Sequence, residues 1–306
     1  MTDETLPVSV PQSAFLEGIK KTDKHIIDEL IMERCPSFVA HWSWSVMRPL
    51  LYSMLGYKKA RKTADYLKTV RGQDGFDYLA EELSVSLKLD HIERMPKTGR
   101  LVVAANHPTG LADGVAVWDA LRRVRRDIVF FANADAIRVN PRFDDVVIPV
   151  EWVMTKRTPA KTRETLRLAK AAFEEEKCIV IFPSGKLAKM VDGQLTEQEW
   201  MSSVISLARK YEAPVQPLNV DALNSWLYYF FARLNGELRD ITLFHELLNK
   251  KNSPFDMTFG PLIGVSALSG DTNAITESLR QYVSYDLKGQ PQLDFIPENT
   301  EIAQGL

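Results

Sequence analysis

The chain has 306 residues, of which 45% are hydrophobic and 25% are charged, as in an ordinary globular protein. Its formal net charge of -2 excludes the overall basic field of a nucleic-acid-binding protein. Two cysteines, Cys35 and Cys178, are too few for a disulfide framework and fit a reducing compartment such as the cytoplasm.

The beginning of the chain lacks the features of a secretory leader. Residues 1–15 contain neither a basic start nor an apolar stretch, and no run approaches the roughly 20 apolar residues of a membrane-spanning helix. We therefore expect a protein that is soluble or peripheral on a membrane. Residues 1–14 are predicted to be a flexible tail, since Pro7 and Pro11 oppose helix formation.

Residues 15–95 form a predicted N-terminal helical segment. Apolar residues recur at helical spacing over residues 74–89, which predicts a helix there. Residues 41–57 combine aromatic residues and leucine with a basic cluster at 58–62. This composition is typical of a helix that faces a membrane surface; the alternative is that these aromatic side chains pack on the core.

Residues 96–265 contain short apolar runs instead. Six of them predict strands, at 101–106, 127–133, 146–150, 177–185, 214–220 and 255–263. Helical patterns lie between several of them, at 115–125, 159–176 and 198–211. Apolar strands separated by helices predict an α/β fold with a central mixed, mostly parallel sheet flanked by helices. Residues 266–306 are predicted to be a C-terminal helix and a tail.

Polar residues follow the first predicted strand. Asn106 and His107 end it, and a turn that contains glycine leads to Asp113. Functional groups of α/β proteins gather at strand ends, and a histidine there can accept a proton from a hydroxyl. A carboxylate such as Asp113 can orient the imidazole and stabilise its charged form. The alternative is that Asp113 only caps the helix that begins near Val115.

A second polar turn follows the strand of residues 177–185. The turn and its lysines comprise Phe182, Pro183, Ser184, Gly185, Lys186 and Lys189. Turn amides together with lysines suit a phosphate or another anionic head group. The alternative is an ordinary turn between a strand and a loop, with solvated lysines.

Together these segments resemble the lysophospholipid and glycerolipid acyltransferase family. The family's Asn-His…Asp, Phe-Pro-Glu-Gly and Val-Pro-Val-x-Pro-Val motifs correspond here to residues 106–113, 182–185 and 213–218, in the same order. The resemblance covers roughly residues 95–265. It implies a glycerolipid-acyltransferase-like core and transfer of a fatty acyl group from acyl-CoA or acyl carrier protein to the hydroxyl of a lyso-lipid. It also implies that no metal and no bound cofactor take part.

The resemblance assigns roles to individual residues. His107 would act as the base that takes the hydroxyl proton, and Asp113 would support it. The main-chain amide of Gly110 or of Gly185 would stabilise the oxyanion. Substrate binding is assigned to Asn106, Arg138, Arg142, Phe182, Pro183, Ser184, Gly185, Lys186 and Lys189. For the two arginines, the alternative is that they lie on a surface loop.

The sequence departs from the family pattern at two places. Five residues separate His107 from Asp113 where the family has four, and Ser184 stands where Glu is common, followed by Lys186 in place of Thr. The first change resembles the branch often labelled hemolysin-like, which includes lyso-ornithine lipid acyltransferases. Lysophosphatidate, lyso-ornithine or another amino-acid lipid, and a sphingoid-type amine therefore all remain possible acceptors.

Other readings use the same residues. A lipid esterase or thioesterase would employ His107 and Asp113 with water as the acceptor, and a catalytically silent lipid-binding homologue would keep only the fold. The aromatic residues 226–231 would line an acyl-chain tunnel or pack in the core. A lyso-lipid acceptor implies a cytoplasmic protein that is peripherally associated with the inner (plasma) membrane.

Overall fold

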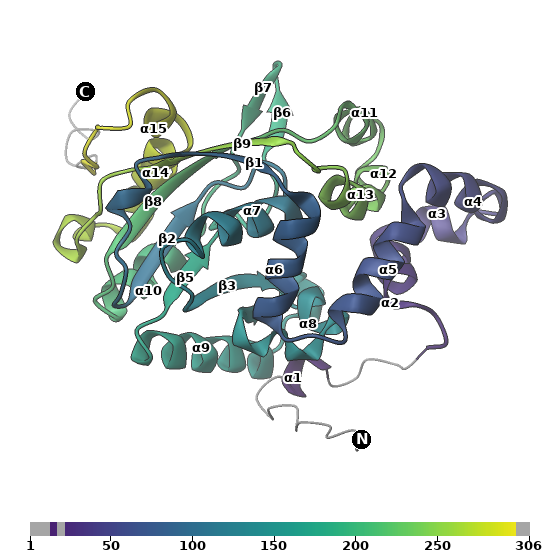
Figure 1. Ribbon diagram of the computed structural model, residues 1–306, viewed down its shortest axis with the longest axis horizontal. Coiled ribbons are helices and arrows are strands. Elements are labelled where there is room, and N and C mark those ends of the chain that lie inside the picture. Colours follow the sequence, from purple (N-terminus) through teal and green to yellow (C-terminus); the bar gives the residue numbers. More distant parts are fainter. Residues whose placement is uncertain (1–12, 17–21, 298–306) are drawn as a thin grey trace.

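A computed structural model describes residues 13–16 and 22–297. A seven-stranded sheet lies at its centre, and a group of N-terminal helices projects to one side (Figure 1). In sheet order the strands are β1 (Ser86–Asp90), β9 (Pro254–Phe259), β8 (Val215–Asp221), β2 (Leu101–Ala105), β5 (Cys178–Ile181), β3 (Ile128–Asn133) and β4 (Val147–Val150). Neighbouring strands are parallel except for β8 and β9. The predicted α/β fold with a mixed, mostly parallel sheet is therefore confirmed.

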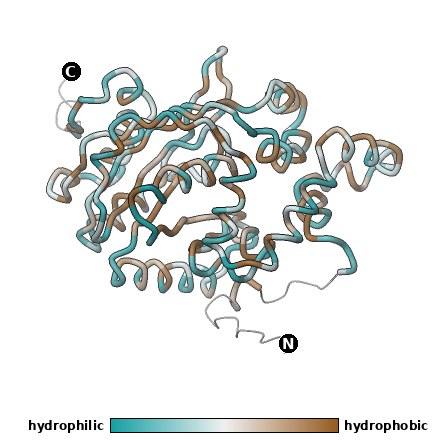
Figure 2. The backbone as a smooth tube through the Cα atoms, viewed as in Figure 1, coloured by the Kyte–Doolittle hydropathy of each residue, from teal (hydrophilic) through white to brown (hydrophobic). Residues whose placement is uncertain are grey.

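Helices cover both faces of the sheet. One face packs against α6 (Gly72–Leu83) and α7 (Leu111–Leu121), and the other against α9 (Pro159–Glu174), α10 (Ser203–Lys210) and α14 (Thr272–Gln281). Alternate residues of β2 enter different cores: Leu101 and Val103 enter the first, and Val102 and Ala104 the second. Because both of its faces are buried, a central strand such as β2 or β5 is apolar along its length (Figure 2).

The N-terminal helices form a separate layer, which we call the arm. The arm comprises α2 (Ile26–Arg34), α3 (Pro36–Ala40), α4 (Trp44–Met54) and α5 (Tyr57–Leu67). Its apolar core is shared with three helices that follow β8, namely α11 (Trp226–Leu234), α12 (Gly236–Ile241) and α13 (Leu243–Leu248). The arm is thus attached to the sheet domain through the connection between β8 and β9.

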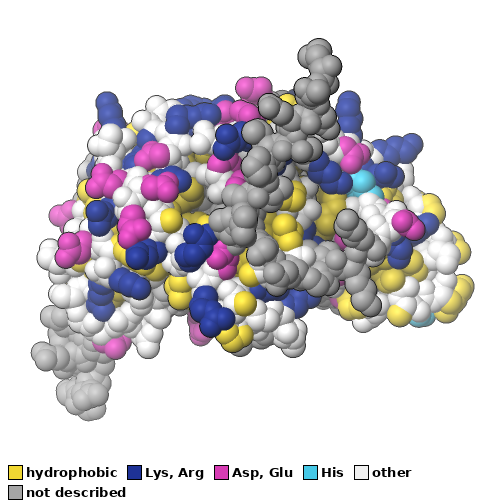
Figure 3. All heavy atoms as spheres, turned by 90° about the horizontal axis from the view of Figure 1, so that it is seen from below, with side chains coloured by type: hydrophobic (Ala, Val, Ile, Leu, Met, Phe, Trp, Pro, Cys, Tyr) yellow, Lys and Arg dark blue, Asp and Glu magenta, His cyan; other side chains and the backbone are white. Residues whose placement is uncertain are grey.

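The outer side of α4 is apolar and exposed. Val46 and Leu50 are 74% and 72% exposed, and Trp42, in the turn before α4, is 81% exposed. Figure 3 shows hydrophobic side chains at the arm's end of the face that it views. In the part of the chain that the structure describes, no helix is long and apolar enough to cross a membrane.

Short elements connect these layers. They are α1 (Ser13–Leu16), α8 (Asp135–Val139), α15 (Leu287–Gly289), the hairpin strands β6 (Lys189–Val191) and β7 (Gln194–Thr196), the 3-10 turns Ile92–Arg94, Pro141–Asp145, Met154–Lys156 and Val265–Leu268, and a π-helical turn at Tyr282–Asp286. The β6–β7 hairpin was not predicted. Its strands have three residues each and are largely exposed, so they lack the apolar run that marks a buried strand.

The predicted helix over residues 74–89 is wrong in its last part. Helix α6 ends at Leu83, where Ser84 adopts a left-handed conformation with φ of 41°, and Ser86–Asp90 is strand β1 at the edge of the sheet. Strand β1 pairs in parallel with β9. The helical spacing extends by chance to Leu87, and backbone pairing with a distant strand decides the conformation instead. Among the described residues of the segment 15–95, the α-helices therefore end at Leu83, and only the 3-10 turn Ile92–Arg94 follows β1.

Other predicted boundaries shift by a few residues. Helix α7 begins at Leu111 rather than near Val115, and β9 ends at Phe259, after which Ile263 forms only an isolated bridge with Val215. In the predicted N-terminal tail, residues 1–12 lie outside the described residues, and 13–14 already belong to α1. The C-terminal helix is present as α14 and its continuation.

Candidate active site

His107 and Asp113 lie together at the carboxyl end of β2. The imidazole Nδ1 is 2.9 Å from Oδ2 of Asp113, and their side chains are 17% and 0% exposed. The carboxylate lies off the direction of an ideal hydrogen bond at Nδ1, so the pair is a close polar contact rather than a well-aligned bond. The structure therefore brings together the two residues that the sequence predicted to form the catalytic pair.

Asp113 is also tied to the start of α7. Its Oδ2 accepts the main-chain N–H groups of Thr109 and Gly110, each at 2.9 Å, and its Oδ1 accepts the Thr109 hydroxyl. These donors satisfy a carboxylate that is fully buried. Asp113 thus caps the helix and faces His107 at the same time, so the two roles that the sequence left open are compatible.

The backbone conformation of Gly110 accommodates the additional residue between His107 and Asp113. Its φ of 89° and ψ of -125° lie in a region that favours glycine, and an added Cβ would come within 3.0 Å of the Leu187 side chain. The chain therefore turns sharply before α7 begins at Leu111, and Asp113 still faces the imidazole.

The Phe-Pro-Ser-Gly turn packs directly against His107. The Phe182 ring stacks on the imidazole, with ring centroids 4.4 Å apart and an interplanar angle of 25°. The two motifs meet because β2 and β5 are neighbouring parallel strands and end at the same edge of the sheet. Gly185 has a φ of 58°, and a Cβ there would lie 2.3 Å from the Trp152 ring. Trp152 therefore covers the turn closely, which only glycine permits.

Both predicted oxyanion donors are already used within the protein. The Gly110 amide donates to Asp113 at 2.9 Å, and the Gly185 amide donates to the Phe182 carbonyl at 3.0 Å. An oxyanion at either position would have to share the donor. The choice between the two amides stays a prediction.

The predicted substrate-binding residues divide into two groups. Phe182 and Gly185 line the cavity described below, and buried Ser184 donates its hydroxyl to the Lys186 carbonyl at 2.8 Å. Asn106 instead fastens β2 to β8: its amide donates to the Val220 carbonyl at 2.9 Å and accepts the Val220 N–H at 2.7 Å.

The remaining predicted residues are exposed or face other partners. Pro183 is buried, and its carbonyl accepts the Met201 N–H at 3.0 Å. Lys186 and Lys189 are exposed, and Arg142 is exposed with one guanidinium N–H directed at the Thr69 carbonyl.

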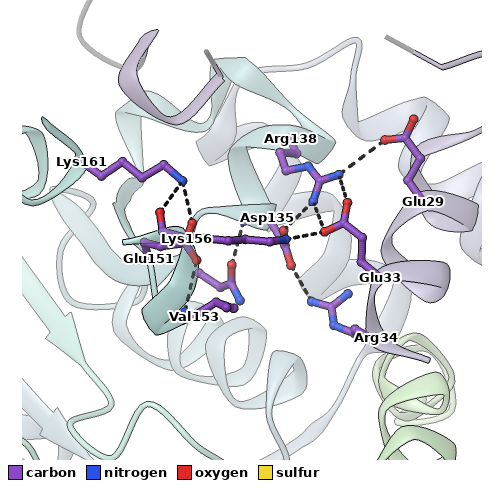
Figure 4. A network of polar contacts seen from close by, with 10 residues as sticks. Glu29, Glu33, Arg34, Asp135, Arg138, Glu151, Val153, Lys156 and Lys161 are labelled. Carbon is purple, nitrogen blue, oxygen red and sulfur yellow. Dashed lines mark hydrogen bonds and ion pairs between the residues drawn. The ribbon is translucent and has the colours of Figure 1, made fainter. Parts of the chain in front are cut away.

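Arg138 is engaged by acids of the arm and of its own helix. Its guanidinium lies 2.7 Å from Glu33, 3.1 Å from Asp135 and 3.5 Å from Glu29, and its side chain is only 10% exposed (Figure 4). Burial raises the pKa of Glu33, but the hydrogen bonds from Arg138 and Lys156 outweigh it and hold that pKa at about 2. Arg138 therefore joins α8 to α2 in this structure instead of facing His107.

A largely apolar cavity of about 340 Å³ extends from His107 to the arm. Its lining includes Leu30 of α2, Ala64 of α5, Phe130 of β3 and Leu247 of α13. The volume is within the range of small-molecule and lipid sites. Its lining suits a hydrocarbon chain whose reactive end lies beside His107.

Three contributors to this region were not predicted from the sequence. Arg34 and Asp135 line the cavity as an ion pair of 2.7 Å, and the buried side chain of Glu197 accepts the main-chain N–H of His107 at 3.1 Å. No local pattern marks these residues, because their partners come from distant segments.

The aromatic residues 226–231 were predicted to line an acyl-chain tunnel or to pack in the core, and as a group they do neither. Trp226 and Phe230 are 75% and 47% exposed on α11, whereas Tyr228 is buried. Helix α13 contributes to the cavity instead, through Leu243, Phe244, Leu247 and Leu248.

Parts of the chain are similar to known acyltransferases. The family model described as Acyltransferase matches residues 86–221. The lyso-glycine lipid O-acyltransferases of Phocaeicola vulgatus and Bacteroides thetaiotaomicron are 23% and 22% identical over 204 residues, which is 64% of this chain and 71% and 73% of theirs. A crystal structure of the 1-acyl-sn-glycerophosphate acyltransferase from Thermotoga maritima is 13% identical with a TM-score of 0.45, over 87% of this chain and 100% of that one.

Proposed function

We propose that the chain is a lyso-lipid O-acyltransferase of the acyltransferase family and that it uses His107 as the general base. The observation that carries this proposal is the 2.9 Å contact between His107 and the buried Asp113 at the wall of an apolar cavity. A base, its supporting carboxylate and a site for a hydrocarbon chain are the parts that acyl transfer between lipids requires.

The geometry supports a direct transfer. Because Nδ1 of His107 faces Asp113, Nε2 is left to accept the proton of the acceptor hydroxyl. The hydroxyl oxygen then attacks the thioester carbonyl, and Asp113 stabilises the imidazolium that forms. When the tetrahedral intermediate collapses, the thiolate leaves and takes the proton from His107. The products are an ester and a free thiol.

We propose acyl-CoA or acyl carrier protein as the acyl donor, and the cavity as the place of a fatty acyl chain. The lining favours this occupant because its side chains are mostly Leu, Ile, Val, Ala and Phe. Within the described residues, the charged side chains that line it are Arg34 and Asp135, beside the titratable His107. The Arg34–Asp135 pair neutralises the two charges, which leaves an environment suited to hydrocarbon.

As acceptor we propose a lyso-lipid with an amino-acid head group in preference to lysophosphatidate. Two observations support this choice. The matched relatives are named for a lyso-glycine lipid, and Ser184 and Lys186 replace the Glu and Thr that are common in the turn of phosphate-ester enzymes. A lyso-ornithine lipid belongs to the same chemical class.

We also propose that the protein is cytoplasmic and rests peripherally on the inner membrane through the arm. The exposed side of α4 presents Val46 and Leu50, Trp42 is exposed in the turn before it, and the neighbouring α5 carries the basic cluster of residues 58–62. An apolar face beside cations is the composition of an interfacial helix on an anionic bilayer. Trp226 of α11 is exposed in the same way and adds a second apolar face.

The proposed function is tested with purified protein and a labelled acyl thioester. Transfer is measured to lyso-glycine lipid, lyso-ornithine lipid and lysophosphatidate, each in parallel with a reaction that lacks an acceptor. We expect product with an amino-acid lipid and little free acid. Release of free acid without any acceptor would identify a thioesterase, and lipid binding without turnover would identify a silent homologue. His107→Ala, confirmed to be folded, should abolish transfer; parental activity in that variant contradicts the role as base.

A further inference from the structure

Glu197 is a buried acid beside the catalytic histidine, in the segment that follows the β6–β7 hairpin. The residue is 5% exposed. Its Oε2 accepts the main-chain N–H of His107 at 3.1 Å, and its Oε1 accepts the indole N–H of Trp200 at 3.2 Å. The carboxylate therefore contacts the main chain of His107 and leaves the imidazole nitrogens to Asp113 and the substrate.

One segment of the chain holds His107 on three sides. The His107 N–H donates to Glu197, its carbonyl accepts the Ala188 N–H at 2.9 Å, and its ring stacks on Phe182. These three partners all belong to residues 182–197. Asp113 approaches from a different element, α7. The contact of the imidazole with Asp113 therefore depends on how firmly residues 182–197 hold the His107 main chain.

Burying a carboxylate at this place costs free energy because the charge loses its hydration. Burial raises the pKa of Glu197 above its usual value, and the hydrogen bond from the His107 N–H offsets only part of that rise. An apolar side chain would fill the same space without this penalty, but it would leave the buried N–H of His107 without its acceptor. The contacts that an apolar residue cannot replace are those to the His107 N–H and to the Trp200 indole, and only the first of them reaches the proposed base.

We propose that Glu197 is a positioning residue for acyl transfer, whose carboxylate fixes the main chain of His107 so that the imidazole stays in contact with Asp113. This inference rests on the proposed role of His107 as the base and adds a residue that does not contact the reacting atoms. A displacement of a catalytic group by about 1 Å lowers a rate by about 10²-fold. Loss of the Glu197 carboxylate should therefore lower kcat more than it changes substrate binding.

The test compares the kcat and the acceptor KM of Glu197→Ala, Glu197→Gln and the matched control Glu199→Ala. Glu199 is an exposed acid two residues farther along the chain. For Glu197→Ala we expect kcat to fall by about 10- to 100-fold and KM to change by less than about threefold. Glu197→Gln, whose amide oxygen can still accept the His107 N–H, should recover much of that loss, and Glu199→Ala should match the parent.

Two outcomes overturn the positioning role: a parental kcat for Glu197→Ala, or a loss confined to KM. If circular dichroism shows that Glu197→Ala is unfolded, Glu197→Leu replaces it, because leucine fills the space without an acceptor, and the same expectations apply. His107→Ala is measured in parallel. Activity in that variant rejects the proposed base, whereas an inactive His107→Ala combined with a fully active Glu197→Ala rejects only the role of Glu197.

Discussion

Replacing Asp113 by asparagine removes the negative charge beside His107 and keeps the shape of the side chain. The amide oxygen can still accept the main-chain N–H groups of Thr109 and Gly110, and the Thr109 hydroxyl can turn to accept from the new amide. The start of α7 should therefore stay intact. What Asp113→Asn loses is the stabilisation of the imidazolium that forms when His107 takes the hydroxyl proton.

The distance between the two groups sets the size of this effect. Two unit charges 2.9 Å apart interact by roughly 6 kcal/mol at an effective dielectric constant of about 20. This is an upper bound, because three other donors share the carboxylate. Since about 1.4 kcal/mol corresponds to a factor of ten, we expect kcat to fall by about 10²- to 10⁴-fold.

The assay is the single-turnover rate of acyl transfer at saturating acceptor, with thermal unfolding measured on the same samples. Asp119→Asn is the matched control, since Asp119 lies on the same helix and pairs with Arg122 and Arg123. The control should transfer at the parental rate. If Asp113→Asn also transfers at the parental rate while folded, then the charge beside His107 does not support catalysis.

Three further perturbations test the cavity, the arm and its ion pairs. Gly114 lines the cavity and has no atom within 4 Å of an added Cβ, so Gly114→Leu should shift the donor preference towards shorter acyl thioesters while Gly114→Ala leaves it unchanged; an identical chain-length profile for both would contradict the placement of the acyl chain. The pKa of Glu33 is lowered from 4.5 to about 2, so its ion pairs stabilise the fold above about pH 4.5 and this contribution fades as the pH falls towards about 2. Glu33→Gln should therefore lower the free energy of unfolding by about 1 kcal/mol at pH 7, discounted because the side chain is 39% exposed, and by much less at pH 3; urea titrations at both pH values that give equal differences would refute this. Leu50→Asp should weaken sedimentation with anionic vesicles, whereas the same change at Leu166, an exposed leucine of α9, should not; equal binding of both variants would remove the arm from the membrane interface.

Much of the sheet could be predicted because its central strands are buried on both faces. A strand such as β2 must be apolar at every position, and this marks it in the sequence without knowledge of its neighbours. The proposed catalytic pair was recognisable for a similar reason, since His107 follows the end of that strand and Asp113 lies six residues later, in the first turn of α7. Strand β1 was missed because it is an edge strand with exposed positions, and its partner β9 lies far along the chain.

Tertiary structure alone decided which charged side chains surround the site. No local sequence pattern distinguishes Arg138 from Arg34. In the structure, Arg138 forms ion pairs with Glu29 and Glu33, whereas Arg34 lines the cavity. Glu197 reaches the His107 main chain only because the hairpin returns the chain to the end of β2. The sequence by itself was enough to predict the strand ends and the polar turns that follow them, because apolar burial and turn preferences depend on neighbouring residues. The partners of each charge depend on which distant segments the fold brings within a few ångströms, and no local pattern carries that information.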